Sequence, residues 1–103
     1  MDIDIVLPDD CRSMAEVRAG VDRTDRELME LLARRYGYMR AAARIKPTRD
    51  AVRDEGRKAE VIRNARRDAA DRDLPADELA AIWNDLVESS IAYEMTEWDR
   101  LRN

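Results

Sequence analysis

Polar and charged side chains interrupt two stretches of the sequence that are otherwise apolar at helical spacing. Arg35 stands in the first stripe, and Ser90 and Glu94, one helical turn apart, stand in the second. Burial of such groups is unfavourable unless they are paired, because a buried charge loses its hydration. Two interpretations follow. These residues form ion pairs between packed helices, or they bind a small charged ligand.

The spacing of Arg35 and Lys46 favours a site for a small anion. The two residues are eleven positions apart, which on one helix places them about 20° apart around the axis and ~16 Å apart along it. Arg18 lies about 25 Å before Arg35 and some 100° round, too far to share that ligand within one chain. In an antiparallel dimer the partner's Arg18 would reach it. Arginine binds a carboxylate through a planar fork, and lysine acts as a compact charge.

The residue content excludes several common kinds of active site. The 103 residues include no histidine and a single cysteine, Cys11. Neither a histidine-containing zinc site nor a Cys-His nucleophile can therefore be assembled, and no disulfide can form within one chain. We expect no metal and no cofactor.

A long first helix, about residues 13–46, must position these cations. Ser13 and Glu16 fit a capping box, and Pro47 disfavours helix in the residue before it. Between them the seam repeats every three or four residues. Its members are Met14, Val17, Val21, Thr24, Leu28, Leu31, Arg35, Tyr38, Ala42 and Ile45. Such a helix, roughly 48 Å long, exceeds a compact domain whose radius of gyration is ~13 Å. We therefore expect an intertwined homodimer.

Two further helices are expected, about residues 54–71 and 75–101. Asp54 suits the N-cap of the first and Pro75 the first position of the second. The inward residues of the first are Ala59, Ile62, Ala65 and Ala69. The apolar stripe of the second holds Leu79, Ile82, Trp83, Leu86, Val87, Ile91, Met95, Trp98 and Leu101, of which Trp83 and Trp98 are interpreted as core. The fold class is therefore all-α, in one domain of residues 1–103 with an N-terminal extension, residues 1–12.

Composition and charge limit the partners. No run of roughly 18 apolar residues is present and the N-terminus is acidic, so we expect a cytoplasmic protein without membrane contact. Residues 34–72 hold 13 basic and 6 acidic side chains, although the net charge is −4. The acidic flanks and the lack of a recognised motif argue against nucleic acid. A non-catalytic helical dimer, with Arg35 and Glu94 paired, stays open as an alternative.

The motifs resemble the all-helical chorismate mutase family, including its isochorismate pyruvate-lyase branch. The most specific part is V-R-x-x-V-D-x-x-D-x-x-L-x-x-L-L-x-x-R, starting at Val17, with a lysine eleven residues after its last arginine. The segments VRDEGRK and SSIAYE further along the chain extend the likeness. The resemblance implies intertwined dimers of three-helix chains, with two identical sites shared between subunits and a small dicarboxylate substrate.

The resemblance also implies roles for individual residues. Arg18 of one subunit and Arg35 of the other bind the two carboxylates of chorismate, and Lys46 and Glu94 lie beside its ether oxygen. Four further positions match the family's substrate-binding residues: Arg53, Asp54, Arg57 and Ser90. The implied reaction is the pericyclic rearrangement of chorismate to prephenate, which needs a bound reactive conformer and stabilisation of charge on the ether oxygen.

Two positions depart from the family pattern. Most mutases of this class have glutamine where this chain has Glu94, which can donate a hydrogen bond only when protonated. We therefore expect activity to be highest at mildly acid pH. Lys58 stands where the mutases usually have a glutamate that binds the ring hydroxyl. This departure makes the lyase reaction, isochorismate to salicylate and pyruvate, a competing hypothesis.

Overall fold

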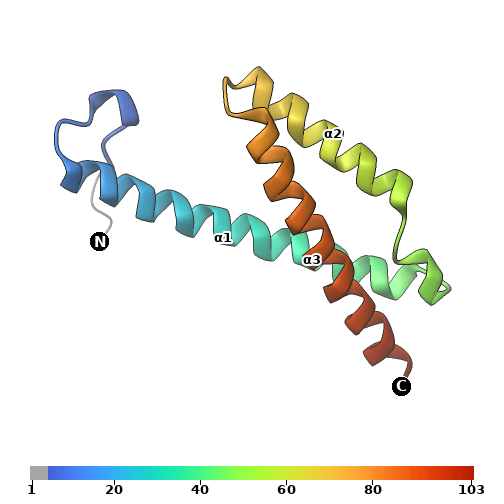
Figure 1. Cartoon of the computed structure of the whole chain (residues 1–103). Coiled ribbons are helices and arrows are strands. Elements are labelled where there is room, and N and C mark those ends of the chain that lie inside the picture. The colour runs from blue at the N-terminus through green and yellow to red at the C-terminus, as the bar shows by residue number, and fades with distance from the viewer. Residues whose placement is uncertain (1–4) are drawn as a thin grey trace. The chain divides into compact units, whose positions relative to one another are not determined.

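The computed structural model describes residues 5–103, which form helices and no strand (Figure 1). The elements are η1 (Pro8–Asp10), α1 (Met14–Ile45), η2 (Arg49–Ala51), α2 (Glu55–Asp71) and α3 (Ala76–Arg102). The all-α class and the three helices are therefore confirmed, and α1 is long, at 32 residues. Residues 1–4, part of the expected N-terminal extension, lie outside the described residues.

Contacts divide the chain into two compact units, residues 1–35 and residues 36–103, and each is described by itself. The expectation of one domain stays a prediction. In the first unit, the start of α1 is capped by side chains. Ser13 Oγ accepts a hydrogen bond from the backbone N–H of Glu16 at 3.2 Å, and the Glu16 carboxylate accepts one from the N–H of Arg12 at 2.8 Å. The capping box thus forms, with its return bond one residue earlier than usual.

In the second unit, α2 and α3 run side by side in opposite directions (Figure 1). Asp54 is the N-cap of α2, because its carboxylate accepts the backbone N–H of Arg57 at 2.9 Å. The turn between the helices places Asp73 at φ 57°, a left-handed conformation that aspartate tolerates. Pro75 is the N-cap of α3 and not its first helical residue, so that expectation was wrong by one position.

The inner face of α2 differs from the expectation at one residue. Ala59, expected to face inward, is exposed, and Lys58 is half-buried in its place. Lys58, Ile62, Ala65 and Ala69 follow one another at spacings of four and three, so they share one face of the helix. The expectation was wrong because it assigned the inner position to the apolar Ala59. Lys58 occupies that position instead, since its charge is paired with Glu88 across the helices.

Small and polar residues make up the buried part of the second unit. Ala43, Val52, Ala69, Ala80 and Val87 are buried, together with the polar Ser90 and Glu94. The last turns of α1 are bonded to α3: the hydroxyls of Tyr36 and Ser89 are 2.6 Å apart, and the rings of Tyr36 and Tyr93 meet edge to face at 5.0 Å. These contacts position the C-terminal end of α1 against α3.

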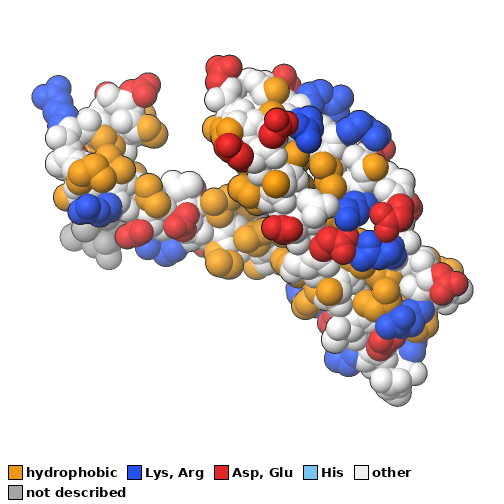
Figure 2. All heavy atoms as spheres, viewed as in Figure 1, with side chains coloured by type: hydrophobic (Ala, Val, Ile, Leu, Met, Phe, Trp, Pro, Cys, Tyr) orange, Lys and Arg blue, Asp and Glu red, His pale blue; other side chains and the backbone are white. Residues whose placement is uncertain are grey.

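Much of the apolar seam of α1 is exposed in the single chain. Seven of its large side chains are 37% to 74% exposed: Met14, Val17, Val21, Leu28, Leu31, Tyr38 and Ile45. Figure 2 shows hydrophobic side chains at the surface along this helix. Within residues 5–103, no helix combines the length and apolarity that crossing a bilayer would need.

Candidate functional site

The second unit brings together two of the residues singled out in the sequence, Lys46 and Glu94. Lys46 directly follows the last residue of α1, and Glu94 is 4% exposed on α3. Lys46 Nζ lies 2.7 Å from Glu94 Oε2 and also donates to the carbonyl of Val52 at 3.4 Å. A buried carboxylate and a partly exposed ammonium thus form one polar site between α1 and α3.

The Glu94 carboxylate is short of directional partners. Among the described residues, no donor meets the buried Oε2 atom with hydrogen-bond geometry, so its contact with Lys46 is an ion pair only. Buried polar atoms are nearly always hydrogen-bonded, and exceptions often mark functional sites. Ser90, one turn earlier on α3, is also buried and donates its hydroxyl to the carbonyl of Leu86 at 2.7 Å.

A second charged group, which we call the Glu88 cluster, joins Glu88 of α3 to Arg53 and Lys58. Arg53 donates to both carboxylate oxygens of Glu88, at 2.8 and 3.1 Å, and Lys58 Nζ lies 2.7 Å from Glu88 Oε2. The hydrogen bonds from Arg53, followed by that from Lys58, lower the pKa of Glu88 to about 2. The hydrogen bonds that Arg53 donates to Glu88 and to Glu55 raise the pKa of its guanidinium group. The carboxylate beside Lys58 is therefore supplied by Glu88 of α3. In the mutases that the sequence resembles, a glutamate usually stands at the position of Lys58 itself, on α2.

Asp54 and Arg57 make contacts local to α2 in the described structure. The carboxylate of Asp54 is occupied as the N-cap, and the guanidinium of Arg57 is paired with Glu60 one turn on. The contacts of these residues therefore do not include Lys46 or Glu94, and their expected roles in substrate binding stay predictions.

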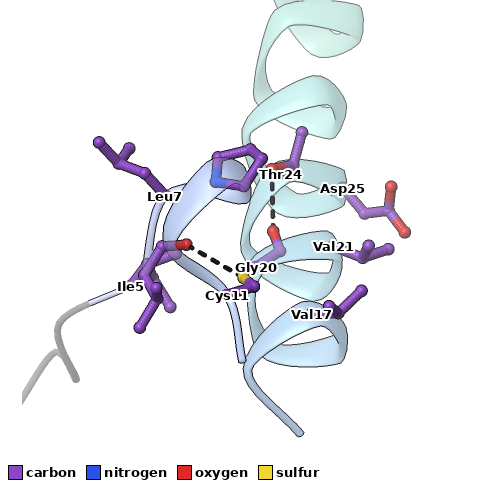
Figure 3. Close-up of a pocket in the computed structure, with 10 residues that line it drawn as sticks. Ile5, Leu7, Cys11, Val17, Gly20, Val21, Thr24 and Asp25 are labelled. Carbon is purple, nitrogen blue, oxygen red and sulfur yellow. Dashed lines mark hydrogen bonds between the residues drawn. The ribbon is translucent and has the colours of Figure 1, made fainter. Parts of the chain in front are cut away.

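Arg18 and Arg35 lie on α1 in the unit of residues 1–35. Arg18 is exposed and Arg35 is half-buried. Their expected roles as carboxylate ligands stay predictions. The same unit holds an apolar cavity of about 400 Å³ between the N-terminal segment and the first turns of α1. Figure 3 shows Ile5 and Leu7 on the N-terminal segment, Cys11 beside Gly20, and Val17 and Val21 on the helix.

The sequence analysis did not predict several residues that contact the expected site residues, among them Glu88, Trp98 and Arg102. Glu88 binds Lys58 and Arg53, and both Trp98 and Arg102 bond to the carbonyl of Lys46. Trp98 was interpreted as core alone. A signal for it was present in the sequence, because Glu94, Trp98 and Arg102 follow one another at intervals of four residues and share a helix face.

The groups that meet at this site favour electrostatic binding of an anion. The part of the chain that the structure describes has no cluster of three or more histidine, cysteine or acidic side chains able to hold a metal ion. What the site offers is an ammonium group, a buried carboxyl group and a hydroxyl on rigid helices. Such groups can bind an anion and stabilise charge that develops on an oxygen atom.

The sequence is similar to a known family of enzymes and to a characterised relative. Residues 17–95 match the family model for chorismate mutase type II. An isochorismate pyruvate lyase from Pseudomonas aeruginosa is 28% identical over 95 residues, which cover 92% of this chain and 94% of the relative. The family match spans most of the chain and includes both Lys46 and Glu94. The protein therefore belongs to the chorismate mutase type II family.

Proposed function

We propose that the protein is a chorismate mutase that converts chorismate to prephenate at a site centred on Lys46 and Glu94. The observation that carries this proposal is the buried pair itself, with Lys46 Nζ 2.7 Å from a Glu94 oxygen that lacks a hydrogen-bond donor. The match of residues 17–95 to the chorismate mutase type II family model supports the mutase reaction.

The proposed mechanism requires no covalent intermediate. The ether bond of chorismate breaks as a carbon–carbon bond forms between the enolpyruvyl methylene carbon and the ring. Negative charge develops on the ether oxygen in this step, and the Lys46 ammonium stabilises that charge. Glu94 donates a second hydrogen bond to the same oxygen when it is protonated. Arg18 and Arg35 bind the two carboxylates and hold the substrate in its folded, reactive conformer. Because the donors stand on helices, little reorganisation is needed during the reaction.

The proposal includes a homodimer with two shared sites. The exposed seam of α1 supports it, because Val21, Leu28 and Leu31 are each 52% exposed in the single chain. A second copy packed along this seam would bury these side chains and bring its Arg18 toward Arg35. Burial of a continuous apolar face is the usual driving force of such helical dimers.

Mixing two inactive variants tests the shared site. Arg18→Ala and Arg35→Ala are each expected to lose activity. If each site takes one arginine from each subunit, a mixed dimer contains one intact site and one doubly defective site. Unfolding and refolding an equimolar mixture should then restore about one quarter of the wild-type activity. A mixture that stays inactive, although sedimentation shows dimers, would contradict the sharing of arginines.

Isochorismate pyruvate lyase activity is the second candidate. The lyase from Pseudomonas aeruginosa supports it, and so does Lys58, whose ammonium is bound to Glu88 at 2.7 Å. In this reaction the bond between the ring and the enolpyruvyl oxygen breaks while a ring hydrogen moves to the enolpyruvyl methylene carbon, giving salicylate and pyruvate. Lys46 would stabilise the charge on that oxygen as it does in the mutase reaction.

Product identification separates the two candidates. The purified protein is incubated with chorismate and with isochorismate at pH 5, 6.5 and 8, and the products are separated by chromatography. Prephenate, formed at a rate that falls as pH rises, would support the mutase. Salicylate and pyruvate formed from isochorismate, without prephenate from chorismate, would support the lyase. Turnover of neither substrate would refute both proposals.

A further inference from the structure

The last turn of α3 is bonded to the end of α1. Trp98 Nε1 donates to the carbonyl of Lys46 at 3.1 Å, and Arg102 Nη2 donates to the same oxygen at 3.0 Å. Arg102 Nη1 donates to the carbonyl of Ala43 at 3.0 Å. The guanidinium also lies over the Trp98 ring, 4.1 Å from its centroid. Two side chains of α3 therefore hold two carbonyls at the end of α1.

These bonds satisfy groups that a helix end leaves without partners. The last four carbonyls of an α-helix have no intrahelical donor, and the C-terminus carries a partial negative charge. Pro47 follows Lys46 directly and has no N–H to offer. Arg102 supplies both a positive charge and two parallel donors, and stacking on Trp98 limits the freedom of its side chain.

The same face of α3 contacts both ends of Lys46. Glu94 meets the ammonium group, and Trp98 and Arg102 meet the backbone carbonyl, and the three residues follow one another at intervals of four. The ammonium stands at the end of a flexible four-carbon stem, and Lys46 lies just beyond the last residue of α1. Without these bonds, its backbone would be free to fray away from α3.

We propose that Trp98 and Arg102 are positioning residues that hold Lys46 against Glu94. The consequence for the reaction rests on the function proposed above, and the consequence for the contact between Lys46 and Glu94 does not. A misplacement of about 1 Å can slow catalysis ~10²-fold, so a small shift of the Lys46 backbone is enough to lower turnover.

The lysine content of the chain allows a test that needs no substrate. Lys46 and Lys58 are its two lysines. Both react with an amine-specific reagent such as formaldehyde and borohydride, so the reactivity of Lys46 can be measured with Lys58 as an internal standard. Peptide mass spectrometry gives the ratio of the two modification rates. Arg102→Ala should raise the relative reactivity of Lys46 about threefold or more, because local opening exposes the ammonium.

Matched variants separate positioning from general damage. Arg100→Ala is the control, because Arg100 lies in the same helical turn and is paired with Glu97. It should leave the lysine ratio unchanged. Trp98→Phe keeps the ring beneath Arg102 and removes one donor, so it should raise the ratio by less. Arg102→Lys keeps the positive charge but loses the two parallel guanidinium donors, so it should give an intermediate ratio of lysine modification rates. If Arg102→Ala does not fold, these last two variants decide the matter.

Kinetics test the consequence for the reaction. With whichever of chorismate and isochorismate the wild type converts, Arg102→Ala should lower kcat about tenfold and leave KM within about threefold. Arg100→Ala should change neither. An unchanged lysine ratio in folded Arg102→Ala would overturn the proposal, and so would a raised ratio with unchanged kcat. If the wild type converts neither substrate, the proposed function fails, and the lysine ratio still decides whether α3 holds Lys46.

Discussion

The Lys46–Glu94 pair and the Glu88 cluster both join a carboxylate of α3 to cations from earlier in the chain, but they differ in burial and bonding. The side chain of Glu94 is 5% exposed and its Oε2 has no donor with hydrogen-bond geometry within the described residues. The side chain of Glu88 is 39% exposed and accepts directional bonds from both Arg53 and Lys58.

This difference indicates which group is available for a ligand. A well-bonded, solvated ion pair contributes little to stability and has few vacant bonding directions. In the free protein the buried Glu94 oxygen has only the charge of Lys46 in place of its lost hydration, because no donor among the described residues bonds it directionally. When Glu94 is protonated, its hydroxyl is available to an acceptor oxygen of a ligand. The number of charges alone would have pointed to the Glu88 cluster, and burial points instead to Lys46 and Glu94.

Loss of Lys46 should lower catalytic efficiency far more than loss of Lys58. Lys46→Ala should lower kcat/KM about 10²- to 10³-fold, the loss typical when a donor to a developing oxyanion is removed. Lys58→Ala is the matched control and should lower it by less than about tenfold, since its charge is already bound by Glu88. Steady-state assays of both variants on one substrate give the comparison. Equal losses would remove the distinction between the two groups.

An intermediate effect is expected at Asp54, which tests whether its cap is its main role. Asp54→Ala should reduce the free energy of unfolding by about 1 kcal/mol, because α2 loses its N-cap. Asp54→Ser keeps a capping oxygen and should retain most of that stability. Urea unfolding measures both. If Asp54→Ser is stable but loses activity, Asp54 also contacts the substrate, as the resemblance implied.

The smallest effect concerns the acid stability of the Glu88 cluster. The pKa of Glu88 is lowered from 4.5 to about 2, so its bonds stabilise the fold above about pH 4.5 and lose that contribution as pH falls toward 2. Glu88→Gln should therefore be less stable than wild type at pH 7, and the difference should vanish near pH 2. Urea unfolding at several pH values measures it. A difference independent of pH would show that the charge of Glu88 is not responsible.

The main helices could be predicted from the sequence because each has strong local signals. Ser13 with Glu16 marks the start of α1, Pro47 marks its end, and Asp54 caps α2, and all three features act as expected. The interruption of an apolar stripe by Glu94 correctly identified a buried polar residue. These signals depend on neighbours within a few residues, so the sequence contains them directly.

Contacts between helices could not be predicted in the same way. Lys58 faces inward instead of Ala59 because Glu88, thirty positions later, pairs with it. The bonds of Trp98 and Arg102 to the end of α1 span more than fifty positions. Helical periodicity gives the face on which a residue lies, but it does not give the partner that lies opposite.

The pH dependence of the activity of Glu94→Gln shows whether Glu94 donates a hydrogen bond to the reacting oxygen. An amide donates a hydrogen bond at every pH, whereas Glu94 donates only when protonated. We expect kcat/KM of the wild type to fall from pH 5 to pH 8. Glu94→Gln should keep its activity without this fall, and Glu88→Gln should retain the wild-type profile. A Glu94→Gln profile identical to that of the wild type would contradict the placement of Glu94 at the reacting oxygen.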